Sequence, residues 1–205
     1  MKKSFILLSA FCFLTACAAF RSTYVVSENS EQTTSAPFWI SPNKAHRIDP
    51  SAEAAKHLYF VGSAEDKSQR LCLKNAETDA FKKTAAETAK ILAKKYSEIK
   101  KAKRKTAAKK TNTKAIREKA EQNILVFLQN DTVVKQYWER RDYMKEKGAA
   151  ANRTAYQCHA VVKVKKTDLI NAIEAYRMKT VKSMPAEDGK IMEKAVDAYI
   201  AKLKK

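Results

Sequence analysis

The stretch Tyr156-Gln157-Cys158-His159-Ala160-Val161-Val162-Lys163-Val164-Lys165 decides the fold of this chain. Every second residue from Tyr156 to Val164 is apolar, and the residues between them are mostly polar or charged. Successive side chains of a β-strand point to opposite faces, so the stretch predicts a strand with one buried and one wet face. That arrangement is typical of an antiparallel sheet that is covered on a single side.

Two further segments predict strands, which gives a small antiparallel sheet of three strands. His57 to Ala64 is a short apolar run that ends in Gly-Ser-Ala, and Thr132 to Met144 carries valines and aromatic residues. A spacing of three or four residues relates the other apolar positions, from about Leu71 to Tyr96, from Ile116 to Leu128, from Thr167 to Tyr176 and from about Glu187 to Leu203. The sequence therefore predicts an α+β fold in which long helices pack on the sheet, with an extra amphipathic helix at the C-terminus.

The composition is strongly basic. The 205 residues include 41 Lys and Arg against 22 Asp and Glu, which gives a formal net charge of +19. Removal of Lys2 and Lys3 with an export signal would leave +17. Such a charge implies attraction to anionic surfaces or polymers, but it says nothing about the fold.

The N-terminal segment has the parts of an export signal. Lys2-Lys3 precedes the apolar run Phe5 to Phe13, and Leu14-Thr15-Ala16-Cys17 resembles the bacterial lipobox. The resemblance implies cleavage before Cys17 and acylation of that residue, for example by palmitate, so that covalent lipid is the only cofactor expected. An ordinary secretory signal with an incidental cysteine and an uncleaved span are the alternatives. The apolar stretch from Phe5 to Phe20 has 16 residues, whereas a spanning helix needs about 20.

The predicted organisation has four parts. Residues 1–16 are the lipoprotein signal peptide, 17–36 a lipidated flexible tether, 37–180 the α+β domain, and 181–205 the C-terminal helix. The tether is rich in Ser, Thr, Glu and Gln and has no apolar period. Three of the four prolines follow it, so Phe38-Trp39-Ile40 is expected to dock on the domain as an irregular lead-in.

Two cysteines remain once Cys12 leaves with the signal and Cys17 carries lipid. Cys72 and Cys158 form an even pair in an oxidising compartment, where a disulfide is one interpretation. Both also have apolar neighbours, so each could equally be an ordinary buried small residue. The sequence leaves this choice open.

A basic insertion lies at about residues 100–114. Residues 82–119 hold 15 basic and three acidic residues, and the candidates for anion binding are Lys100, Lys101, Lys103, Arg104, Lys105, Lys109 and Lys110. They either contact anionic lipid headgroups or wall polymers, or they form a solvated face of a lysine-rich chain. The insertion contains no aromatic residues that could stack on bases, so no nucleic acid is expected.

Neither an enzyme nor a metal site is expected. The three histidines are scattered, and Cys158 and His159 are adjacent on a strand, where they point to opposite faces. The chain has no phosphate loop, no dinucleotide fingerprint and no nucleophile paired with a base. The aromatic residues Tyr137, Trp138 and Tyr143 either pack in the core or form a binding surface.

The order of these elements resembles a known family. Pro37-Phe38-Trp39, the strand ending Tyr59-Phe60-Val61-Gly62, the alanine-spaced helix, Val133-Val134-Lys135-Gln136-Tyr137-Trp138 and the strand from Tyr156 follow in turn. They resemble LPP-twenty-type outer-membrane lipoproteins and the amino-terminal domain of the flagellar assembly protein FlgT. The resemblance covers residues 37 to 175 and implies a βαββ, dodecin-like sheet with helices on one face.

The expected function is a structural or interaction role in the bacterial envelope. The resemblance implies an outer-membrane lipoprotein without enzyme activity, whose domain lies in the periplasm or at the cell surface. Ala18 is not an acidic residue that would favour retention at the inner membrane. A binding module for anionic lipid or wall polymer, and a subunit of a flagellar or secretion assembly, are the alternatives. The oligomeric state is left open.

Overall fold

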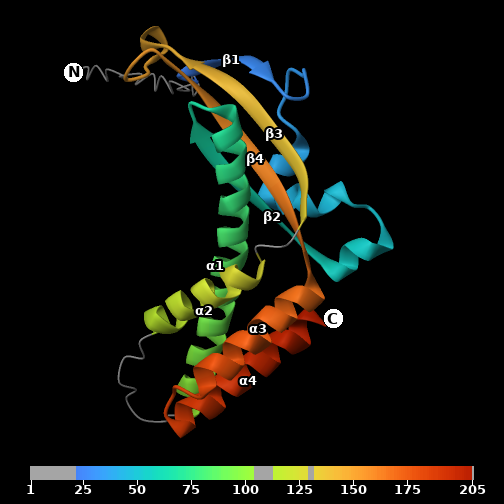
Figure 1. The fold of residues 1–205 in the computed structure, drawn as a ribbon, viewed down its shortest axis with the longest axis vertical. Helices are drawn as coiled ribbons and strands as arrows, with labels where there is room; N and C mark the ends of the chain where they lie inside the picture. The colour runs from blue at the N-terminus through green and yellow to red at the C-terminus, as the bar shows by residue number, and fades with distance from the viewer. Residues whose placement is uncertain (1–21, 104–112, 129–131, 205) are drawn as a thin grey trace, which may run out of the picture.

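The structure is a computed structural model that describes residues 22–103, 113–128 and 132–204. The predicted α+β class is confirmed, because the described chain combines one antiparallel sheet with α-helices (Figure 1). The strands are β1 (Tyr24–Asn29), β2 (His57–Asp66), β3 (Thr132–Tyr143) and β4 (Arg153–Lys165). The helices are α1 (Gln69–Lys103), α2 (Thr113–Leu128), α3 (Lys166–Val181) and α4 (Ala186–Leu203).

The sheet has four strands in the order β1-β3-β4-β2, so the prediction of three strands was wrong. The added strand, β1, comes from the segment that was expected to be a flexible tether. It pairs antiparallel with β3, where Tyr24 lies opposite Tyr143 and Asn29 opposite Glu139. Most of its side chains are exposed on both faces. An edge strand of this kind has no buried face, and therefore no apolar period by which the sequence could show it.

β4 lies between β3 and β2, and the sheet around it is covered on both faces. One face of β4 packs under α1. On the other face, the 3₁₀ segments η1 (Phe38–Ile40) and η2 (Pro42–Ile48) cover Val161 and Tyr137, and Trp39 is only 2% exposed. The docking of the lead-in is thus confirmed. The prediction of a fully wet second face was wrong, because an irregular segment buries it without any periodic signal of its own.

The first half of α1 lies very close to β2. Ala76 and Ala80 are fully buried there, and a Cβ atom on Gly62 would lie 2.0 Å from the carbonyl oxygen of Ala76. Small residues on both elements make this approach feasible. The structure also joins Cys72 of α1 to Cys158 of β4 by a disulfide, with 5.7 Å between their Cα atoms. The start of α1 is therefore held to the sheet by packing and by a covalent bond.

The second half of α1 leaves the sheet and forms a helical bundle with α2, α3 and α4 (Figure 1). Leu92 and Tyr96 of α1 share a core with Ile124 of α2, Ile173 of α3 and Val196 of α4. The last helix was expected to be a separate segment at 181–205. Instead, α4 supplies a large part of the main core, so it belongs to the domain.

A substitution at Gly62 tests the close approach of α1 to β2. In Gly62→Ala the new Cβ meets backbone atoms of Ala76 and Ala80, which cannot rotate away, and we expect a loss of stability of about 3 kcal/mol or more. Gly189→Ala in α4 is the matched control, since its nearest atom is the side-chain Cγ1 of Val181 at 3.3 Å. Alanine also favours the helix, so the control should stay within about 1 kcal/mol of the parent. Urea unfolding measures the stability of both variants. Equal free energies of unfolding for Gly62→Ala and Gly189→Ala would contradict the close packing of α1 on β2.

Candidate functional site

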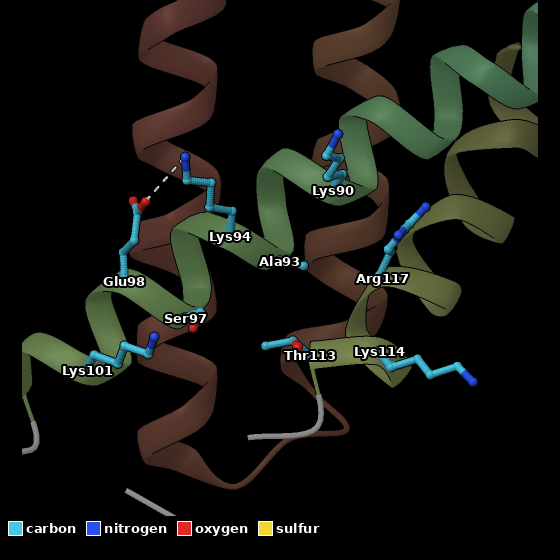
Figure 2. Close-up of a pocket in the computed structure, with 9 residues that line it drawn as sticks. All are labelled: Lys90, Ala93, Lys94, Ser97, Glu98, Lys101, Thr113, Lys114 and Arg117. Carbon is cyan, nitrogen blue, oxygen red and sulfur yellow. Dashed lines mark ion pairs between the residues drawn. The ribbon is translucent and has the colours of Figure 1, made fainter. Parts of the chain in front are cut away.

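A basic groove runs between the second half of α1 and the start of α2 (Figure 2). Its volume is about 510 Å³, and it opens to solvent. Nine residues from the two helices line it: Lys90, Ala93, Lys94, Ser97, Glu98, Lys101, Thr113, Lys114 and Arg117. We call this site the α1–α2 groove.

The spacing of residues on the two helices produces the groove. On α1, Lys90, Lys94 and Lys101 recur at intervals of four and seven, which places them along one face of the helix. Ala93 and Ser97 lie on the same side and are too small to fill the space between the helices. On α2, Lys114 and Arg117 are three residues apart and share one face. Figure 2 shows Ser97 and Thr113 between the basic side chains of the two helices.

The groove has a strong excess of positive charge. Five of its nine lining residues are lysine or arginine and one, Glu98, is acidic, whereas only 41 of the 205 residues of the chain are basic. Glu98 lies 3.9 Å from Lys94, and both side chains are largely exposed. An exposed pair at this distance contributes about 0.5 kcal/mol or less, so it leaves Lys94 able to turn toward an anion. Lys90 and Lys114 have similar exposed partners, Glu87 at 3.7 Å and Glu118 at 3.8 Å. Among the described residues, Lys101 and Arg117 form no ion pair.

The structure separates the predicted anion-binding residues. Lys101 lines the α1–α2 groove, and Lys103 is the last residue of α1. Arg104, Lys105, Lys109 and Lys110 lie outside the described residues, as does Cys17. The sequence prediction did not single out Lys90, Lys94 or Arg117. Their spacing on helical faces was the signal that could have found them.

Lys100 was expected to bind anions, but it is a buried structural residue. Its side chain is turned toward α4, where Nζ lies 2.7 Å from Oδ1 of Asp188, and it also donates to the hydroxyl of Tyr96 at 3.1 Å. Only 8% of the residue is exposed. The hydrogen bond to Asp188 is the main reason why the pKa of Lys100 is raised. Its charge is already neutralised inside the protein and does not contribute to the groove.

A second polar cluster lies on the sheet under the lead-in. Glu139 is 7% exposed, accepts a hydrogen bond from the hydroxyl of Tyr137 at 3.1 Å and forms an ion pair with Arg141 at 2.5 Å. Burial is the main reason why the pKa of Tyr137 is raised to about 12. His159 was expected on a wet face, but burial of its ring lowers its pKa. Both oxygens of the Glu139 carboxylate have hydrogen-bond partners within the protein. We therefore interpret this cluster as part of the packing between the sheet and the lead-in.

The described residues contain no group of three or more His, Cys, Asp or Glu side chains arranged to hold a metal ion. None of their helices is long and apolar enough to cross a membrane. Comparisons with models of known protein families, with characterised proteins and with solved structures give no match to this chain.

Adjacent lysines test the distinction between buried and groove positions. Lys100→Met removes one partner of a largely buried ion pair, and we expect a loss of about 1–3 kcal/mol, moderated by the partial exposure of Asp188. Lys101→Met, the same change one residue later at an exposed position, should alter stability by less than about 0.5 kcal/mol. Urea unfolding of both variants measures the difference. Equal effects would show that Lys100 is not held as described.

Proposed function

We propose that this chain is a non-enzymatic, lipid-anchored protein of a bacterial outer membrane that binds anionic groups of the cell envelope through the α1–α2 groove. The observation that carries the proposal is that five of the nine residues that line the groove between two helices are basic, whereas one is acidic. The lipobox-like sequence ending at Cys17 supports the anchor, because two or more acyl chains hold a protein stably at a membrane. The domain then lies in the periplasm or at the cell surface.

The family resemblance enters as part of this proposal. β2, α1, β3 and β4 follow one another as strand, helix, strand and strand, apart from the intervening α2. We propose that they form the βαββ, dodecin-like unit of LPP-twenty-type lipoproteins, to which β1 adds an edge strand. The helix α2 would then be an addition that forms the groove together with the second half of α1.

The position of the groove favours an envelope polymer over the headgroups of the anchoring membrane. Residues 17–24 span at most about 25 Å when fully extended, so a lipid on Cys17 stays near the start of β1. That end of the sheet is also where α1 begins. Tyr24 lies opposite Tyr143, and Tyr143 opposite Arg153 at the start of β4. Asp66, which ends β2 just before α1, lies opposite Tyr156 near the same end of β4. At a rise of about 1.5 Å per residue, Lys90 and Lys101 lie about 32 and 48 Å along the helix axis from the start of α1 at Gln69. An anionic chain that extends away from the membrane fits this distance.

The expected binding is electrostatic. Each basic residue near an anionic surface contributes about 1 kcal/mol, and exposed charges are screened by salt. Five such residues support multivalent attachment to phosphate or carboxylate groups rather than recognition of one small molecule. The hydroxyls of Ser97 and Thr113 in the groove lining can donate further hydrogen bonds to such groups.

Charge reversal in the groove tests the proposal. The protein is residues 18–205, which include every described element, and the probe is polyphosphate of defined length. We expect Lys94→Glu/Lys114→Glu/Arg117→Glu to weaken binding by about 100-fold or more, since three contacts are lost, and added salt to weaken binding by the parent protein.

A variant with the same change in net charge is the control. Lys74, Lys182 and Lys194 are exposed and lie outside the groove, so reversing all three should weaken binding far less. If both triple variants lose the same affinity, overall charge rather than the groove binds the polymer. If neither variant changes it, the groove has no part in binding.

A further inference from the structure

A second pocket lies at the junction between the sheet and the helical bundle, away from the α1–α2 groove. Its volume is about 400 Å³. Three segments that are distant in the sequence line it, namely the residues around the start of β2, the end of β4 with the start of α3, and the end of α4. The lining residues are Ala55, Lys56, His57, Lys165, Lys166, Thr167, Ile170, Leu203 and Lys204. We call it the junction pocket.

The lining of the junction pocket is basic. Four of its nine residues are lysines, and none is acidic. Lys165 and Lys166 come from the end of β4 and the start of α3, and Lys204 follows the end of α4. These three lysines carry like charges that repel one another, and water only partly screens this repulsion. The arrangement is complementary to an anion that enters between them.

The pocket also has an apolar floor. Leu203 is 6% exposed and belongs to the main core, and Ile170 is a half-buried residue packed against the same core. The apolar stems of the lysines extend this surface up to the charged rim. Cations alone would suit inorganic phosphate, and an apolar floor alone would suit a neutral ligand. The combination requires a ligand with both properties.

We propose that the junction pocket binds an amphiphilic anion, that is, an acyl or alkyl chain that ends in a phosphate or carboxylate. The apolar chain contacts Ile170 and Leu203, and the anionic end lies among Lys165, Lys166 and Lys204. A volume of about 400 Å³ is within the range of small-ligand sites, roughly 300–1,000 Å³. It accommodates the head and the adjoining part of a chain. The site shares no residue with the α1–α2 groove, so it is independent of the function proposed above.

Calorimetric titration of residues 18–205 with three soluble probes tests the proposal. Decyl phosphate, kept below its micelle concentration, should bind at least 10-fold more tightly than decanol or inorganic phosphate. Lys165→Glu/Lys204→Glu should weaken decyl phosphate binding by at least 10-fold, and both lysines are exposed, so the fold is retained. Lys94→Glu/Lys114→Glu makes the same change in net charge in the α1–α2 groove and should leave the affinity within about 3-fold.

Each other outcome overturns the proposal. If decyl phosphate binds no better than decanol or inorganic phosphate, the site does not combine the two properties. If both double variants lose the same affinity, net charge alone is responsible. If only vesicles containing phosphatidylglycerol bind, and monomeric decyl phosphate does not, the lysines contact a membrane surface and the pocket holds no ligand. The polyphosphate binding of Lys94→Glu/Lys114→Glu tests the function proposed for the α1–α2 groove. Its result does not change the conclusion on ligand binding in the junction pocket.

Discussion

The close contact between Gly62 of β2 and the Ala76–Ala80 turn of α1 is the constraint on which the rest of the structure depends. It leaves no space for a side chain, so it fixes the line along which α1 crosses the sheet. The Cys72–Cys158 disulfide holds the same end of the helix to β4. Because α1 is a single helix of 35 residues, about 52 Å long, its direction at the sheet determines where its far end lies. A small change at Gly62 would therefore move the whole bundle.

The far half of α1 has two sides with different roles in the bundle. Its apolar side, with Leu92 and Tyr96, forms one core with α2, α3 and α4, and Lys100 closes the end of this core through its ion pair with Asp188. Its opposite side keeps lysines in water, where they have only weak exposed partners. The same helix thus contains both a structural lysine and groove lysines, and only packing against α4 distinguishes Lys100 from its neighbour Lys101.

The sequence predicted those parts of the fold that have a periodic pattern. The alternation from Tyr156 to Lys165 identified β4, and the spacing of small residues in α1 identified the helix that packs on the sheet. β1 was missed because an edge strand exposes both faces, and the cover over Val161 was only partly foreseen because Trp39 lies in an irregular segment. Charge counts located the basic region but could not show that Lys100 turns inward. That depends on a contact 88 residues away in the sequence.

In the proposed arrangement, the protein is held to the membrane at its sheet end and is basic at its helical end. This arrangement depends on the lipid on Cys17, because the anchor decides which end faces the membrane. The most direct measurement is the intact mass of the protein extracted from bacterial membranes, beside a Cys17→Ser variant. We expect a chain that begins at Cys17 and carries the added mass of acyl chains, which the variant lacks. An uncleaved or unacylated chain would contradict the anchor and the orientation that follows from it.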